Sequence, residues 1–200
     1  MKEINNTDGD FEIFAGSPLC IGPGSSCSVT MITNNHSRDL DPAWASTVFA
    51  GYSLAYTMEM IDQGGSFLAW SIMLHSNTSN DTLTEGHQPN FSSNGQWIVY
   101  SHQDNIYKIA TAGGTPVQLT DTNQDQYPHW GWANDKIVFQ RNNGGNFEDI
   151  FVMNSDGTGV EALVSTSDNE YQPSWSADCT KVAYYALTAG NFDIFVYVVP

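Results

Sequence analysis

The most constraining feature of the sequence is a Pro-x-aromatic motif that occurs four times. The prolines of these motifs are 47, 39 and 45 residues apart. The four copies are Pro42-Ala-Trp44, Pro89-Asn-Phe91, Pro128-His-Trp130 and Pro173-Ser-Trp175. A recurrence at this spacing indicates a chain built from repeated supersecondary units.

Short apolar runs follow each motif at similar distances. The second run of each unit is Leu54-Ala-Tyr56, Ile98-Val-Tyr100, Ile137-Val-Phe139 or Val182-Ala-Tyr184. The third is Phe67-Leu-Ala-Trp70, Ile106-Tyr107, Ile150-Phe151 or Ile194-Phe195, and three units end on Leu83-Thr84, Leu119-Thr120 or Leu163-Val164. The turns carry Gly, Asn, Asp and Ser, and no helical period is sustained. This pattern predicts an all-β fold, a β-propeller of four-stranded antiparallel blades with about four blades in the chain.

We expect one domain over residues 1–200, with blades at 38–84, 85–120, 121–164 and 165–200. The last blade lacks its own fourth strand. Residues 1–37 read as the third and fourth strands of a partial blade, because Gly9–Phe14 matches Gly145–Phe151 and Ser28–Thr33 matches Pro116–Thr120. The N-terminal strand could therefore complete the last blade and close the ring. Two chains exchanging their ends, or a chain that is part of a longer protein, would also account for the strand count.

One stretch resembles the repeat of TolB-like β-propellers, a family of WD-like propeller repeats. It comprises Gln88–Tyr100, Asn105–Lys108 and Gly113–Thr120, and Asp149–Gly157 resembles the third strand and following turn of the same repeat. The resemblance covers about residues 39–200. It implies a propeller fold, a periplasmic or extracellular location, and six or seven blades in typical members. It says little about activity, because such repeats serve as binding platforms, peptidase domains and lyase scaffolds.

The charge balance restricts the choice of partners. The chain has 6 Lys and Arg against 22 Asp and Glu, for a formal charge of −16, which disfavours nucleic acid and anionic membrane surfaces. No stretch is apolar enough to insert into a membrane, and the segment MKEINNTDGDFE lacks the apolar run of a signal peptide. Cys20 and Cys27 could close a small loop as a disulfide or remain reduced thiols, which would leave Cys179 over.

Acidic and aromatic residues gather just before the first strand of each unit, which lines the axis of a propeller. We therefore expect an acidic mouth that binds a protein, peptide or glycan, formed by Asp39, Asp41, His87, Gln88, Asp125, Gln126, Tyr127, Glu170 and Tyr171. The acids could instead simply solubilise the loops. No cofactor is required by this interpretation, and Ca²⁺ is a candidate ligand because carboxylate oxygens suit hard cations.

The leading interpretation is a binding scaffold without enzymatic activity. No residue is assigned a catalytic role, because no triad, phosphate loop or local zinc motif is present. The alternative is a metal-dependent lyase or hydrolase at the channel mouth, in which His87 and His129 would sit at nearly equivalent positions. A half-propeller whose role is assembly, including a homodimer through shared end strands, is the third hypothesis.

Overall fold

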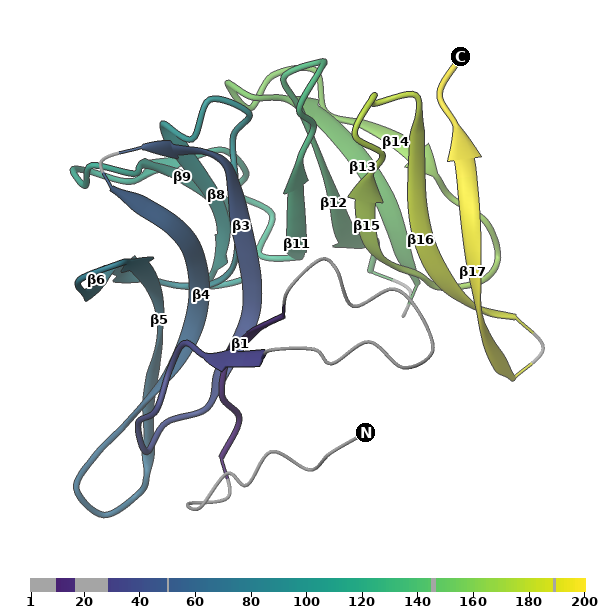
Figure 1. Cartoon of the computed structure of the whole chain (residues 1–200). Helices are drawn as coiled ribbons and strands as arrows, with labels where there is room; N and C mark the ends of the chain where they lie inside the picture. Colours follow the sequence, from purple (N-terminus) through teal and green to yellow (C-terminus); the bar gives the residue numbers. More distant parts are fainter. Residues whose placement is uncertain (1–9, 17–28, 50, 145–146, 189) are drawn as a thin grey trace, which may run out of the picture.

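The fold is all-β and follows the predicted blade pattern. A computed structural model describes residues 10–16, 29–49, 51–144, 147–188 and 190–200. Within these ranges the regular elements are seventeen β-strands, and no helix that could cross a membrane is present. Four antiparallel sheets stand around a common axis as propeller blades, following one another from β3 to β17 (Figure 1).

Each blade is a meander of neighbouring strands. The first blade contains β3 (Asp39–Phe49), β4 (Tyr52–Ile61), β5 (Phe67–Ser76) and β6 (Asn80–Glu85). The second contains β7 (His87–Phe91), β8 (Trp97–His102), β9 (Asn105–Ala110) and β10 (Val117–Gln118). The third contains β11 (Asp125–Trp130), β12 (Lys136–Asn142), β13 (Glu148–Asn154) and β14 (Glu161–Val164). The fourth has three strands, β15 (Glu170–Trp175), β16 (Lys181–Thr188) and β17 (Asn191–Val198).

The core lies between blades, which explains why the central strands read as continuous apolar runs. In β8 the residues Ile98, Val99 and Tyr100 are each at most 1% exposed. Ile98 and Tyr100 pack with the first blade, whereas Val99 packs with Trp130 and Phe139 of the third. Successive side chains point to opposite faces of a strand, so a strand covered on both faces needs apolar residues at every position.

Two of the three repeat tryptophans belong to this core. Trp130 and Trp175 are 3% and 7% exposed, and each packs against the blade that precedes it. Trp44, at the equivalent position of the first blade, is 57% exposed. Within the part of the chain that the structure describes, the sheet that precedes the first blade has two strands, and neither is equivalent to β8 or β12, against which Trp44 would pack.

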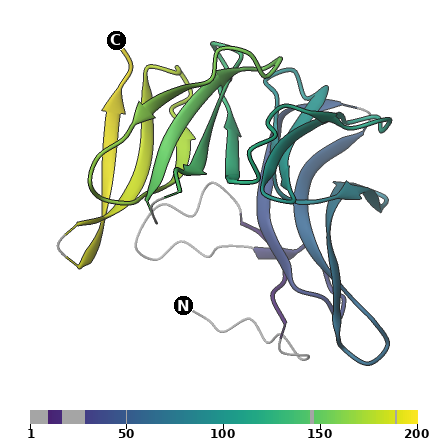
Figure 2. The ribbon, with the colours of Figure 1, turned by 180° about the vertical axis from the view of Figure 1, so that it is seen from behind.

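The N-terminal strands do not complete the last blade, which corrects the expected ring closure. β1 (Phe14–Gly16) and β2 (Val29–Met31) pair with each other in a separate two-stranded sheet. Ile13 and Ile32 pack on Leu54 and Tyr56, and this contact places the pair against the first blade (Figure 2). The two strands thus form half of a blade that precedes the first one. By pairing with each other they keep their apolar residues packed against the first blade. Cys20 and Cys27, for which a disulfide and a pair of reduced thiols are both open, lie outside the described residues.

Among the described residues the fourth blade contains three strands. The hydrogen-bonded neighbour of β17 is β16, and the figure places β17 at the end of the stack (Figure 1). Alternate apolar side chains of β17, namely Phe192, Ile194, Val196 and Val198, are 65%, 78%, 57% and 64% exposed. The face of β17 that a further blade would cover is therefore apolar and open.

Candidate functional site

The first strand of every blade contains the same irregular corner. Asp41, Gln88, Tyr127 and Gln172 each precede the repeat proline and have φ of 51°, 58°, 53° and 48°. The register of β3, β7, β11 and β15 shifts at these residues, as it does at a β-bulge. The left-handed backbone of a non-glycine residue is costly, and its recurrence in all four blades means that the fold requires this corner.

The four corners converge on one open pocket at the inner edges of the blades. Its volume is about 360 Å³, and it is lined by Asp41, Pro42, Ala43, Gln88, Pro89, Asn90, Tyr127, Pro128, His129, Gln172 and Pro173. The prolines supply apolar walls, and the residues before them supply carboxylate, amide and phenol groups. We call this the axial pocket. Of the predicted binding residues, Asp41, Gln88 and Tyr127 line it.

Hydrogen bonds between successive first strands fix the shape of the axial pocket. The Tyr127 backbone N–H donates to Gln88 Oε1 over 2.9 Å, which ties the third blade to the second. The Trp130 N–H donates to Asn90 Oδ1 over 2.9 Å, and the Trp175 N–H donates to His129 Nδ1 over 3.3 Å. Asn90 and His129 both follow the repeat proline, so they are equivalent residues with the same structural role.

The two histidines proposed for a metal-dependent enzyme occupy different positions in the repeat. His129 follows its proline and accepts a backbone hydrogen bond, whereas His87 precedes its proline by two residues. Burial lowers the pKa of His129 to about 4. Burial also lowers the pKa of His87, although the nearby Asp41 acts in the opposite direction. Among the residues that the structure describes, no group of three or more His, Cys, Asp or Glu side chains could hold a metal ion.

Three predicted binding acids are buried rather than displayed at the mouth. Asp39, Asp125 and Glu170 are 2%, 0% and 1% exposed. Each lies three residues before the repeat proline and closes the loop that leads into its blade. Their side chains accept hydrogen bonds from Asn35 Nδ2 at 2.8 Å, from Thr122 Oγ1 at 2.7 Å and from Thr166 Oγ1, respectively. These acids stabilise the start of the first, third and fourth blades, and their burial keeps them from the surface where a partner would bind.

The second blade has no acid at this position, because the ring of Tyr100 leaves no space for a side chain there. Its equivalent residue is Gly86, with φ of 141°, and an added Cβ would lie 2.5 Å from the ring of Tyr100. The buried Tyr100 ring thus closes this corner in place of a carboxylate.

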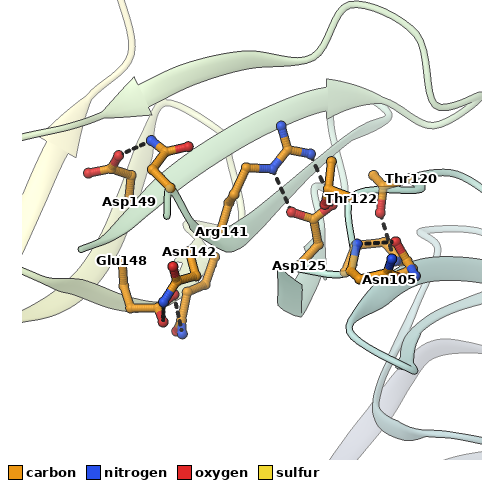
Figure 3. Close-up of polar contacts among 12 residues, drawn as sticks. Asn105, Thr120, Thr122, Asp125, Arg141, Asn142, Glu148 and Asp149 are labelled. Carbon is orange, nitrogen blue, oxygen red and sulfur yellow. Dashed lines mark hydrogen bonds and ion pairs between the residues drawn. The ribbon is translucent and has the colours of Figure 1, made fainter. Parts of the chain in front are cut away.

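Arg141 is a site residue that the sequence analysis missed. Its Nε and one terminal nitrogen donate to Asp125 Oδ1 and Oδ2 over 2.6 and 2.9 Å (Figure 3). The guanidinium also lies over the rings of Phe139 and Phe151, at 5.3 and 4.7 Å from their centroids. The sequence did offer one signal for Arg141. In a chain with 6 Lys and Arg against 22 Asp and Glu, an arginine near the end of the second strand of one repeat indicates a specific acidic partner.

A second missed feature is a pair of neighbouring carboxyls between the third and fourth blades. Asp149, at the start of β13, is 3% exposed and lies beside Glu170. Burial raises the pKa of Glu170, and the charge of Asp149 raises it further, while a hydrogen bond from Thr166 lowers it. A similar pair occurs at the first blade, where burial raises the pKa of Asp39 to about 6 and Glu12 adds to the effect.

Gln126 and Tyr171 lie outside the axial pocket. Gln126 Nε2 donates to Asp104 Oδ1 over 2.5 Å in a neighbouring polar pocket of about 270 Å³ that amide side chains largely line. The Tyr171 ring stacks on Tyr185 with centroids 5.1 Å apart and meets Phe192 edge-on. Tyr171 therefore packs within the fourth blade.

Comparison with known proteins supports the fold and leaves the activity open. No family model matches the chain. The uncharacterized protein Atu1656 of Agrobacterium fabrum is 27% identical in an alignment of 111 positions that covers 48% of this chain and 38% of that protein. The chain thus spans less than half the length of this curated relative.

Solved propellers resemble the structure along most of the chain. TolB from Acinetobacter baumannii has a TM-score of 0.69 at 17% identity, covering 86% of this chain and 43% of that one. A putative TolB from Agrobacterium tumefaciens has a TM-score of 0.59 at 15% identity, covering 84% and 79%. A nidogen/laminin complex has a TM-score of 0.62 at 13% identity, covering 84% and 64%. Peptidases also occur among the similar structures. The fold is therefore that of TolB-like propellers, as the repeat predicted.

Proposed function

We propose that the protein is a binding scaffold without enzymatic activity, and that a protein, peptide or glycan partner docks over the axial pocket. The observation that carries the proposal is the convergence of four equivalent corners on one open pocket of about 360 Å³. A concave site with apolar walls and a few fixed polar groups is the usual form of a ligand site. Support from the comparisons is limited to the fold, which generally serves as a protein-binding platform.

The chemistry of the axial pocket suits an extended, partly polar ligand. Pro42 and the Tyr127 ring offer apolar contacts, whereas the exposed side chains of Asp41 and Gln172 offer polar groups. Asp41 can accept from an ammonium, amide or hydroxyl donor of the partner. The backbone around these groups is held by hydrogen bonds between blades, so little ordering is needed when a ligand binds.

Exposed residues of the pocket provide the test of this proposal. The labelled protein is applied to a peptide library and a glycan array, and hits are remeasured with Asp41→Ala and Gln172→Ala. We expect each substitution to weaken binding about tenfold or more, since each removes a polar contact at the pocket. The matched control, Asp156→Ala, alters an exposed acid of a turn between β13 and β14 and should leave binding unchanged. Ligands that bind all three variants equally would place the binding surface elsewhere.

The open end of the fourth blade favours an assembly role as a second candidate function. Among the described residues the fourth blade has three strands and the apolar side chains of β17 are exposed, whereas β1 and β2 form a separate two-stranded sheet. A second copy of this chain could cover β17 with such a sheet. An uncovered edge strand with apolar side chains readily pairs with another chain.

A further inference from the structure

We propose that a proline-rich segment of a partner protein binds beyond the end of β11, against the exposed ring of Trp132. The site is a small pocket of about 180 Å³, lined by His129, Trp132, Trp175, Ser176 and Ala177, which we call the tryptophan pocket. Of these five residues, His129 also lines the axial pocket. The inference goes beyond the proposed function and does not depend on it, because it concerns the turns that follow the first strands rather than the corners within them.

The repeat itself does not require a large side chain at Trp132. Trp132 stands in the turn between β11 and β12, where the second and fourth blades have Ser93 and Ala177. The same backbone hydrogen bond closes these three turns, from Ser92 to Trp97, from Gly131 to Lys136 and from Ser176 to Lys181, over 2.9, 2.7 and 2.9 Å. Trp132 is nevertheless 47% exposed. A tryptophan displayed beside a hollow, where the fold accepts a small residue, is typical of a contact residue for a partner.

Contacts between the third and fourth blades hold the walls of the tryptophan pocket in place. The Trp175 N–H donates to His129 Nδ1 over 3.3 Å, within the pocket. The Ala133 N–H, next to Trp132, donates to Cys179 Sγ over 3.2 Å. These bonds fix the turn that carries Trp132 against the fourth blade. A segment that binds here therefore meets walls that are already ordered, which lowers the entropy cost of binding.

The free polar groups of the tryptophan pocket are hydrogen-bond donors. A neutral His129 that accepts at Nδ1 carries its proton on Nε2, and the indole nitrogen of Trp132 can only donate. Neither of these N–H groups has a partner among the residues that the structure describes. Trp175 is 7% exposed, and its Nε1–H is buried without a hydrogen-bond partner. The Ser176 hydroxyl, by contrast, already donates to Asp178 Oδ1 over 2.6 Å.

Aromatic walls with free donors match the chemistry of proline. A proline residue has an apolar ring and a carbonyl acceptor but no backbone N–H, and a polyproline II segment leaves its carbonyls free to accept. Aromatic-lined grooves are the recurring receptors for such segments. A sugar would present hydroxyl donors, for which the five lining side chains offer no carboxylate or amide acceptor. The volume is below the roughly 300–1,000 Å³ of a small-molecule site, so the pocket suits one ring of a longer segment.

Charge selects the residues that flank the prolines of the partner. The turns beside the tryptophan pocket carry two exposed acids, Asp135 and Asp178. Hydrogen bonds from Ser176 and Thr180 lower the pKa of Asp178 to about 2, so this carboxylate is ionised at neutral pH. The chain as a whole has a formal charge of −16. Lysine or arginine beside the prolines would therefore speed association and favour the complex.

The test is calorimetric titration of the whole chain with a capped peptide that carries a run of about six prolines between lysines and adopts the polyproline II form. We expect saturable binding with a dissociation constant on the order of 0.1 mM. Trp132→Ser, which introduces the residue of the second blade, should weaken binding about tenfold or more. The matched control, Phe147→Ser, removes another aromatic residue of the third blade that is 46% exposed, and should retain the affinity.

A spectroscopic measurement separates a direct contact from a general loss of folding. In nitrogen–proton correlation spectra, the indole signal that is missing from Trp132→Ser should shift when the proline peptide is added to the unaltered protein. A peptide with serine in place of every proline should neither shift this signal nor bind. Absence of saturable binding, or equal affinity for the serine peptide or for Trp132→Ser, would overturn the proposal. A sugar that shifts the Trp132 signal when the proline peptide does not would overturn it as well and assign the pocket to a glycan.

Discussion

His129 combines a fixed structural role with an unusual protonation requirement. Its Nδ1 accepts the backbone N–H of Trp175, so that nitrogen must carry no proton. Burial lowers the pKa of His129 to about 4, below the ordinary value of 6.5. Between these values the unfolded chain binds a proton that the folded chain does not. Stability from His129 is therefore present above pH 6.5 and is lost as the pH falls toward 4.

Replacing His129 with the residue used in the second blade tests this requirement. His129→Asn keeps an acceptor, as Asn90 does for Trp130, but does not titrate. Relative to this variant, the unaltered protein should lose about 1 kcal/mol of unfolding free energy between pH 7.5 and 5.5, and about 3 kcal/mol by pH 4. Urea unfolding at these three pH values measures the difference. Asp39 titrates in the same range with the opposite sign, but it is common to both proteins. Parallel pH profiles for the two proteins would refute a His129 that stays neutral in the folded protein.

From the sequence, Asp41, Gln88 and Tyr127 could be placed near the axis, but the burial of the acids could not be predicted. Asp41, Gln88 and Tyr127 immediately precede the repeat prolines, so a local motif places them at the corner. Asp39 and Asp125 lie only two residues earlier in the same motif, yet their carboxyls point into the protein. Which of two nearby acids faces inward depends on the bulge at the corner and on partners such as Arg141, and neither can be read from a local pattern.

At the scale of the strand pair, β11 and β12 of the third blade are joined by an ion pair between Asp125 and Arg141. Asp125 is fully buried, and the side chain of Arg141 is 15% exposed. Asp125→Leu alone should lower the unfolding free energy by about 3–5 kcal/mol, because it leaves the guanidinium without its partner in a largely buried place.

The double variant, Asp125→Leu with Arg141→Met, should recover most of this loss. Methionine retains packing over Phe139 and Phe151, and an apolar pair in place of a buried ion pair is often close to neutral. A double-mutant cycle by chemical denaturation gives the coupling energy. Equal destabilisation of the double variant and Asp125→Leu would show that the charge on Arg141 contributes nothing to the penalty.

The positions of individual strands could be predicted from the sequence, whereas the pairing of the N-terminal strands could not. Runs such as Ile98-Val-Tyr100 carry apolar residues on both faces, which is the mark of a strand between two sheets. Ser28–Thr33, by contrast, resembles the fourth-strand segment Pro116–Thr120, and this resemblance does not specify which blade it joins. The structure pairs its central residues with β1, because Ile13 and Ile32 together cover the exposed face of the first blade.

For the whole molecule, the stack of blades leaves unequal ends. The first blade is partly covered by the β1–β2 sheet, whereas β17 presents four exposed apolar side chains. The interfaces inside the stack are built from equivalent third strands, of which Ile106 and Ile150 are fully buried. The face of β17 thus has the composition of an interface.

This composition predicts self-association with an unusual dependence on salt. Light scattering after gel filtration should give about twice the monomer mass of 22.0 kDa at moderate protein concentration. Ile194→Lys with Val196→Lys should restore the monomer mass, while Asp178→Asn, at an exposed turn of the same blade, should not. Each chain carries a formal charge of −16, so the copies repel one another, and raising the salt from about 0.01 to 0.15 M shortens the screening length from about 30 to 8 Å. The dimer should therefore become more stable as the salt concentration rises, whereas a complex held by ion pairs would become less stable. A monomer at both salt concentrations would exclude β17 as a self-association surface.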